Sequence, residues 1–473
     1  MTTPLNLVSL ARCVLGASVS LVLFGCGPQF DAPSKLQSLR ILAIKKDRPY
    51  LRPTPSNEDD TPVSKDSALD YVEHMTLAME DSRLDADKLD ENKKPKPLQK
   101  LWFAGCNNPP GDNYFSCLLN VWLSFKAFKE LGPGAAGLAD GEGWSVAEHV
   151  SEIGQANLLA FVSEAFPKQY SEMMGLLQSD PTAAETALQG ITKPALALRV
   201  GAGDVFDYKV PSWVIAEHPR SSDENIPRYG FSQVFLAVCD GEIDFSPGWE
   251  TVEDPLAVLA DATRGFPLTC YEPGTKNERG PDNFMVAYSN LYVYDDERVT
   301  NANPVISGFN FDGKPLDKTT TCVGAACLTM DDTATCDDPN SPAKRVKLCK
   351  KNSSSDCKEY DVEPDIMESI GPDVELGIEQ TIDNSEEDFI ASTAGGGDNK
   401  HLFEQMWIRY YADAGDIKND AKRLQDATEG WFGEHTTKWK VPTEGTGPVH
   451  IWSVVYDNRG GVDWVRATVC LEE

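Results

Sequence analysis

The sequence predicts a mainly β protein made of two antiparallel β-sandwiches, the first of which carries a helical insertion. Short apolar runs separated by turn-forming residues recur along most of the chain, as in sandwich proteins. A strand-like segment in each half contains a tryptophan, Trp102 in the first and Trp407 in the second. One stretch, residues 145–190, changes to helical spacing. The chain has 473 residues, which is long enough to bury sizeable cores in more than one domain.

The first sandwich is predicted over residues 39–300. Its expected strands are apolar runs or alternating segments at 39–44, 75–79, 101–106, 195–200, 205–210, 234–239 and 284–294. Between them lie stretches rich in proline and charged residues, such as 45–69 and 84–100. These stretches are expected to be loops.

The helical insertion is expected at about residues 120–192. Within 145–190 many apolar residues lie three or four positions apart, which is typical of amphipathic helices. Pro167 and Pro181 stand where helices can begin, and Asp180 is a suitable N-cap before the second proline. Two or three helices are therefore predicted.

The second sandwich is predicted over residues 301–473, after the turn-rich segment Thr300–Pro304. Its expected strands are 305–311, 374–382, 406–411, 449–456 and 462–471. The last two form a hairpin, in whose turn Gly460 and Gly461 are expected to supply positive φ angles. Because the antibody-type cysteine spacing around the tryptophan is absent, the sandwiches are expected to be immunoglobulin-like in architecture only.

The N-terminal segment, residues 1–25, has the pattern of an export signal. Its apolar run ends before it is long enough to span a bilayer, and it leads into Leu23-Phe24-Gly25-Cys26. This ending resembles the lipobox of bacterial lipoproteins. The resemblance implies that Cys26 is diacylated, that cleavage occurs before it and that residues 26–38 form a tether. Gly27, where an inner-membrane signal usually has Asp, favours lipid anchoring at the outer membrane. The alternative is a simple cleaved signal followed by an incidental cysteine.

Ten cysteines remain after the signal and Cys26 are set aside: Cys106, Cys117, Cys239, Cys270, Cys322, Cys327, Cys336, Cys349, Cys357 and Cys470. An even number in an exported protein predicts five disulfides. Proximity favours the pairs Cys106–Cys117 and Cys239–Cys270. The loop at about 320–358 holds a cluster with no C-x-x-C and no intervening histidine, so disulfides are predicted there rather than zinc. Cys470 is expected to tie the last strand to this loop.

The net charge of −31 argues against a nucleic-acid partner and against direct binding to anionic lipid, both of which require a basic face. No H-E-x-x-H, G-x-S-x-G or Walker A motif occurs, and the histidines are scattered. A non-enzymatic protein is therefore predicted, with a cryptic secreted hydrolase as an alternative.

No metal or cofactor is expected as a main feature, although the chain contains strongly acidic segments. Residues 356–389 contain thirteen Asp or Glu and one Lys. A calcium site formed by Asp361, Glu363 and Asp365, or by 295–297, is a secondary hypothesis, because the ordered calcium-loop motif is missing. A solvated acidic surface is the preferred interpretation.

Aromatic residues are concentrated in the last domain: Tyr410, Tyr411, Trp431, Trp439, Trp452 and Trp464. Exposed aromatic rings stack on sugar rings or anchor protein interfaces. Packing within the core is the preferred interpretation for these six residues.

Several segments together resemble a group of secreted lipoproteins from myxobacteria. They are 39–44 (LRILAI), 101–106 (LWFAGC), 234–239 (VFLAVC), 301–306 (NANPVI) and 452–461 (WSVVYDNRGG). The resemblance covers most of the mature chain, except residues 120–190, and implies a lipid-anchored envelope protein with immunoglobulin-like domains, without a known activity. The predicted function is a structural or binding module for an envelope protein or glycan. The alternative is an accessory subunit that docks through the helical insertion.

Overall fold

A computed structural model describes the parts of the chain that form the sheets and their helices. The described residues are 34–51, 71–80, 98–109, 117–132, 143–153, 197–218, 228–250, 265–294, 301–316, 344–347, 358–366, 405–426 and 430–472, apart from 37, 212, 433, 434, 444 and 446, with a few single positions elsewhere. The protein is mainly β, as predicted, with several mostly antiparallel sheets. We refer to the described residues up to 294 as the first unit and to those from 301 as the second unit.

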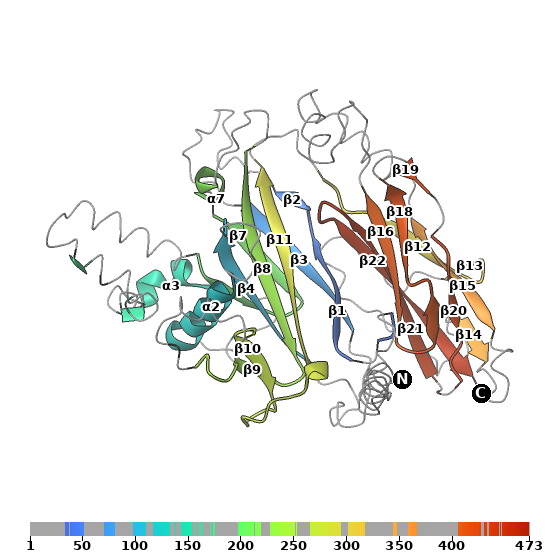
Figure 1. Ribbon diagram of the computed structural model, residues 1–473, viewed down its shortest axis with the longest axis horizontal. Helices are drawn as coiled ribbons and strands as arrows, with labels where there is room; N and C mark the ends of the chain where they lie inside the picture. The colour runs from blue at the N-terminus through green and yellow to red at the C-terminus, as the bar shows by residue number, and fades with distance from the viewer. Residues whose placement is uncertain are drawn as a thin grey trace, which may run out of the picture.

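Two facing sheets build the first unit (Figure 1). Across the larger sheet the strands are β2 (Tyr50–Leu51), β11 (Phe284–Tyr294), β8 (Tyr229–Cys239), β4 (Gln99–Asn107), β6 (Arg199–Ala202) and β5 (Gly143–Ser145). Across the smaller sheet they are β1 (Arg40–Lys46), β3 (Tyr71–Glu80) and β7 (Val205–Val210). The core between the sheets includes Trp102, Phe206, Leu236 and Leu291. Trp102 is fully buried there, because alternate residues of β4 face opposite sides of the sheet.

The second face of the larger sheet is covered by helices and a hairpin. These elements are α2 (Leu118–Leu131), α3 (Val146–Ile153), β9 (Glu242–Phe245) and β10 (Leu268–Tyr271), while α7 (Trp213–Glu217) and η4 (Pro281–Asn283) lie at the sheet ends. Phe103, Phe125, Phe128 and Trp144 belong to the core under α2. Ser145 caps the start of α3, since its hydroxyl accepts the Glu148 N–H and donates to the Glu148 carboxylate.

The second unit also has two facing sheets. One contains β14 (Lys344–Lys347), β22 (Val462–Glu472), β21 (Gly447–Asp457), β16 (Met406–Ala412), β18 (Ala421–Asp426) and β19 (Gly430–Trp431) in this order. The other contains β13 (Lys314–Leu316), β12 (Ile306–Phe311), β15 (Glu359–Ile366), β20 (Thr437–Lys440) and β17 (Asp416–Lys418). Phe311, Ile408, Tyr410 and Trp439 are part of the core between them.

Several details differ from the sequence prediction. Trp407 lies on β16 but is 36% exposed, and Trp439 is the tryptophan buried in the core of the second unit. The reason is the two-residue period of a strand: Met406, Ile408 and Tyr410 point into the core, so Trp407 points away from it. The short strand β5 lies inside the predicted helical range and pairs with β6. Most of residues 154–196 and the predicted strand 374–382 lie outside the described residues.

Among the described residues, no helix is both long enough and apolar enough to cross a membrane.

Candidate functional site at the junction of the two units

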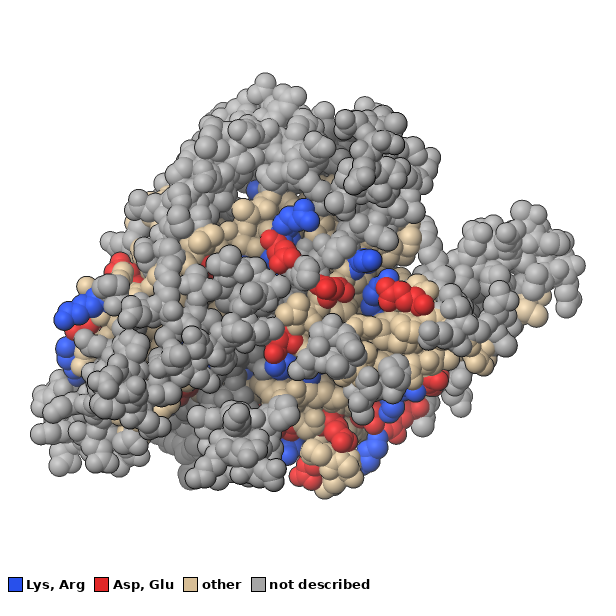
Figure 2. All heavy atoms as spheres, turned by 180° about the vertical axis from the view of Figure 1, so that it is seen from behind, with Lys and Arg blue, Asp and Glu red and all other residues tan. Residues whose placement is uncertain are grey.

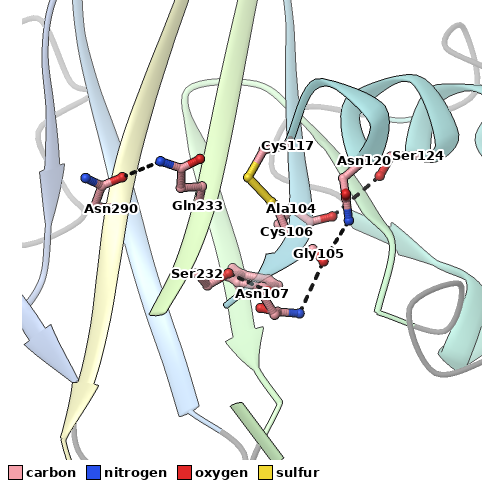
Figure 3. The surroundings of a disulfide bond; sticks show 11 residues. Ala104, Gly105, Cys106, Asn107, Cys117, Asn120, Ser124, Ser232, Gln233 and Asn290 are labelled. Atoms are coloured by element: carbon pink, nitrogen blue, oxygen red, sulfur yellow. Dashed lines mark hydrogen bonds between the residues drawn. A yellow bond between two sulfur atoms is a disulfide. The ribbon is translucent and has the colours of Figure 1, made fainter. Parts of the chain in front are cut away.

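The described cysteines are all disulfide-bonded. Cys106–Cys117 joins β4 to the start of α2 (Figure 3), and Cys239–Cys270 joins β8 to β10. These are the two pairs that proximity favoured. Cys470 on β22 is also disulfide-bonded. Its partner lies outside the described residues, because the other four described cysteines bond to one another. Cys26 and the predicted cluster of Cys322, Cys327, Cys336, Cys349 and Cys357 lie outside the described residues too.

The end of the predicted tether is packed against the second unit. The N–H of Leu36 donates to the carbonyl of Ala412 at 2.8 Å, and the N–H of Ala412 donates to the carbonyl of Ser34 at 2.9 Å. Leu36 is only 1% exposed. The chain therefore docks on β16 of the second unit before it enters β1 of the first. Residues 34–36, near the end of the predicted tether 26–38, are therefore part of the fold.

Apolar side chains from both units meet in what we call the junction. Leu36, together with Leu42 and Ala43 of β1, packs against Trp452, Val454 and Val462 of β21 and β22. The hydroxyl of Tyr456 donates to the carbonyl of Leu42 at 2.7 Å. Figure 1 shows β1 lying between the larger sheet of the first unit and the β21–β22 pair of the second. Because these side chains are buried from both sides, the junction resembles a small core rather than a flexible link.

A buried ion pair crosses the junction. The Lys45 ammonium lies 2.7 Å from one carboxylate oxygen of Asp463, and the other oxygen accepts the N–H of Ile306 at 2.8 Å. The side chains of Lys45 and Asp463 are 14% and 5% exposed. Burial raises the pKa of Asp463, although Lys45 opposes this shift. Asp463 therefore connects β1, the start of β12 and β22.

The turn of the last hairpin is organised by Asp457. One of its carboxylate oxygens accepts the N–H groups of Arg459 and Gly461, at 2.8 and 2.7 Å. The other oxygen accepts the Asn301 amide at 3.3 Å. Gly460 has the expected positive φ of 90°, whereas Gly461 does not have a positive φ. Gly461 is required for a different reason, because a Cβ atom there would lie 2.0 Å from the Asp457 carboxylate.

Asn303 and Arg459 complete the contacts between the units. The Asn303 amide donates to the carbonyl of Lys46 at 2.6 Å, and its oxygen accepts the N–H of Val462 at 3.1 Å. Arg459 donates to the Tyr50 hydroxyl at 3.2 Å and lies 4.9 Å from the centre of that ring. Three of the segments that carry the sequence resemblance, 39–44, 301–306 and 452–461, thus meet at the junction. Sequence reasoning identified the segments but not their contact, because they are far apart along the chain.

The six aromatic residues of the last domain are distributed between packed environments. Tyr410 and Trp439 are fully buried in the core of the second unit, and Trp431 packs against that core. Trp452 is buried in the junction, where Tyr411 and Trp464 pack against it. These residues do not form one exposed platform. The alternating pattern of β16, β21 and β22 sends them to different faces of the sheet.

The acidic residues proposed for calcium face basic groups in the structure. Asp361 lies 3.9 Å from the ammonium of Lys438, and Glu363 lies 3.7 Å from the imidazole of His435. The side chain of Asp365 and residues 295–297 lie outside the described part. Within the described part, no group of three or more His, Cys, Asp or Glu side chains is placed to hold a metal ion.

Two titratable groups, His450 and Asp413, lie near the start of β21. The backbone N–H of His450 donates to the Asp413 carboxylate at 2.9 Å. The ring nitrogen Nδ1 of His450 lies 3.1 Å from the Thr468 hydroxyl. Burial raises the pKa of Asp413 to about 6 and lowers the pKa of His450 to about 4. The ring of His450 packs edge-on against Trp452 at 5.7 Å, which ties this pair to the junction.

Comparisons with protein-family models, with curated proteins and with solved structures find no match to this chain.

Proposed function

We propose that the chain is a lipid-anchored protein of the bacterial outer membrane that acts as a non-enzymatic structural or binding module for an envelope protein or glycan. In this proposal the two units are immunoglobulin-like sandwiches, and the segment at about 120–192 is a helical insertion in the first. The supporting observation is the docking of Ser34–Leu36 between the units. A lipid attached to the chain before this segment would therefore hold both units at the membrane.

The short tether limits how far the junction can lie from the membrane. Ser34 lies eight positions after the predicted lipidated Cys26. A chain of this length reaches at most about 29 Å when fully extended. The junction would therefore stay close to the lipid surface, and the two units would project from it with a fixed relative orientation. Such a geometry suits the presentation of binding surfaces.

The surface charges support a role that does not depend on binding a polyanion. In Figure 2, Lys and Arg side chains of the described residues lie next to Asp and Glu side chains, and neither sign forms a broad patch on that face. This face therefore has no broad basic patch for nucleic acid or anionic headgroups, which agrees with the net charge of −31. Membrane attachment is therefore assigned to the lipid alone, for which two or more acyl chains suffice.

The test of anchoring is the variant Cys26→Ser. We expect it to lose palmitate label and to leave the membrane fraction, because the thiol that carries the diacyl group is absent. The matched control is Cys13→Ser, which lies in the segment that cleavage removes and should fractionate like the wild type. Unchanged membrane fractionation of Cys26→Ser would overturn the proposal.

The accessory-subunit alternative is favoured by one observation. Met174, in the predicted helical stretch 145–190, is an apolar side chain that is 43% exposed and therefore accessible to a partner. A photo-crosslinking residue at position 174 should then attach to a single envelope protein in intact cells. Absence of a crosslinked product would leave the binding-module proposal as the better explanation.

A further inference from the structure

A ladder of aromatic pairs runs along β8 and β11, on the face of the larger sheet that α2 partly covers. Antiparallel pairing places Tyr229 opposite Tyr294, Phe231 opposite Tyr292 and Phe235 opposite Tyr288. The ring centres of these pairs are 5.7, 5.1 and 6.0 Å apart. Tyr50 of β2 extends the ladder, because its ring centre lies 4.9 Å from that of Tyr294. The rings thus line one continuous strip of the sheet.

One rung of this ladder is a pair of amides. Gln233 lies opposite Asn290, and the amide nitrogen of Gln233 donates to the oxygen of Asn290 at 3.1 Å. Figure 3 shows Gln233 between Asn290 and the Cys106–Cys117 disulfide, which joins the neighbouring strand β4 to the start of α2. Gln233 is 5% exposed, and its buried side-chain oxygen has no hydrogen-bond partner. A buried acceptor without a partner is costly, so its presence in the strip points to a ligand that supplies a donor.

The side chains of the four rungs are neutral, and the nearest charges are the Lys46 ammonium, which donates to the backbone carbonyl of Asn290 at 2.8 Å, and Arg459 beside Tyr50. The rungs contain only aromatic and amide side chains. Tyr288, at the end away from the junction, is 49% exposed and is among the most exposed large hydrophobic residues of the described part. Flat rings offer negatively polarised faces to C–H groups, and amides both donate to and accept from hydroxyl groups. A ligand that matches both features has rings with C–H faces and hydroxyl edges, and it carries no charge.

We propose that this strip, the Tyr288–Asn290–Tyr292 face of β11 with its partners on β8, binds a neutral glycan built of pyranose rings. Sugar rings stack on Tyr288 and Tyr292, and their hydroxyl groups bond to the Asn290–Gln233 amide pair. The proposal rests on the binding role proposed above and names the class of ligand. Tyr50 links the strip to the junction through Arg459. One end of the bound glycan therefore lies beside the second unit, and the rest of it lies along the first unit.

The experiment uses the full chain carrying Cys26→Ser, so that sugar binding is measured independently of anchoring. The probes are a neutral N-acetylglucosamine tetramer, cellohexaose and maltohexaose, with heparin as an anionic comparison. Saturation-transfer NMR from the protein should reach the ring C–H protons of at least one neutral oligosaccharide. Raising the salt concentration should leave that binding unchanged, because neither the oligosaccharide nor the side chains of the four rungs carry charge.

Variants then assign the binding to the strip. Tyr288→Ala should weaken binding about tenfold, whereas Tyr288→Phe, which keeps the ring, should stay within about twofold of the starting protein. Asn290→Ala should also weaken binding about tenfold, because it removes the amide that bonds the hydroxyl groups. The matched control is Trp407→Ala, which removes an exposed aromatic ring from the second unit and should change nothing.

The glycan proposal would be overturned by no saturation of any neutral oligosaccharide, by binding of heparin alone, or by undiminished binding by Tyr288→Ala. A crosslinker placed at position 288 that captures a protein, in cells where no neutral sugar binds, would also overturn it. None of these results bears on membrane fractionation of the wild type, so the anchoring proposal stands or falls separately.

Discussion

At the scale of single residues, the junction depends on a few side chains whose surroundings the sequence does not reveal. Asp457 and Asp463 are ordinary acidic residues in a hairpin, yet both are buried and both bond groups from distant segments. The sequence correctly predicts the turn that contains Gly461, but it predicts the wrong reason for a glycine at this position. A glycine is needed there because the Asp457 carboxylate occupies the space of a side chain, rather than because of its φ angle.

Gly461→Ala is therefore expected to lower the free energy of unfolding by about 2 kcal/mol, because the new Cβ must displace the Asp457 carboxylate. Urea unfolding followed by fluorescence measures the change. The control is Gly280→Ala, where the nearest atom to the new Cβ is 4.0 Å away and the change should stay below about 1 kcal/mol. Equal stabilities of the two variants would contradict the role given to Gly461.

The pair Asp413 and His450 predicts two opposing dependences of stability on pH. The pKa of Asp413 is raised from 3.8 to about 6, so its ionisation removes stability as pH rises between these values. The pKa of His450 is lowered from 6.5 to about 4, so its protonation removes stability as pH falls between these values. In the wild type the two effects largely cancel between about pH 4 and pH 6.

Single variants should separate these effects. The stability of Asp413→Asn should increase as pH rises from about 4 to 6, and more steeply than that of the wild type. Of the two groups, only His450 still titrates in this variant. His450→Gln should show the opposite slope. Urea unfolding at several pH values measures both. Parallel pH profiles for the two variants would show that these groups do not titrate as their burial predicts.

At the scale of elements, composition predicted the strands whose residues are themselves apolar. β1, β4, β8, β11, β21 and β22 all coincide with apolar runs. β15, β18 and β20 were missed because their sequences, EYDVEPDI, AKRLQD and TKWK, are dominated by charged residues. They form strands because β15 pairs with β12, β18 with β16 and β20 with β17. These pairings depend on the tertiary structure and cannot be read from local composition.

The parallel pairing of β14 with β22 predicts the disulfide of Cys470. Arg345 lies opposite Cys470, so a strand from within the loop 320–358 runs beside the last strand. Peptide mapping under non-reducing conditions should therefore recover the Cys470 peptide linked to a peptide from 320–358. The Cys106–Cys117 pair serves as the internal control. A link from Cys470 to another chain, or to no peptide, would contradict the prediction.

At the scale of the whole molecule, the junction makes the two units one body. Asn303 is the clearest test, because it bonds the end of β1 and the start of β22 with a single side chain. Asn303→Ala removes the side-chain partner of the Lys46 carbonyl and of the Val462 N–H. It should lower the free energy of unfolding by about 2 kcal/mol. In calorimetry we expect the melting temperature to fall and a single transition to broaden or divide into two, since each unit keeps its own core.

The control for this prediction is Asn277→Ala. Asn277 lies on an exposed turn of the first unit and bonds only nearby residues there. Its loss should change stability by less than about 0.5 kcal/mol. If both variants melt alike, the junction does not couple the units.

The sequence by itself determined the mainly β class, most of the apolar strands, the last hairpin and the two disulfides that close short segments. These features follow from local composition and from spacing along the chain. Only the tertiary structure decided that the three segments 39–44, 301–306 and 452–461 meet, that Trp439 rather than Trp407 is buried, and that aromatic pairs flank an amide pair on β8 and β11. Such features arise from register and from contacts between residues hundreds of positions apart, which local sequence patterns do not encode.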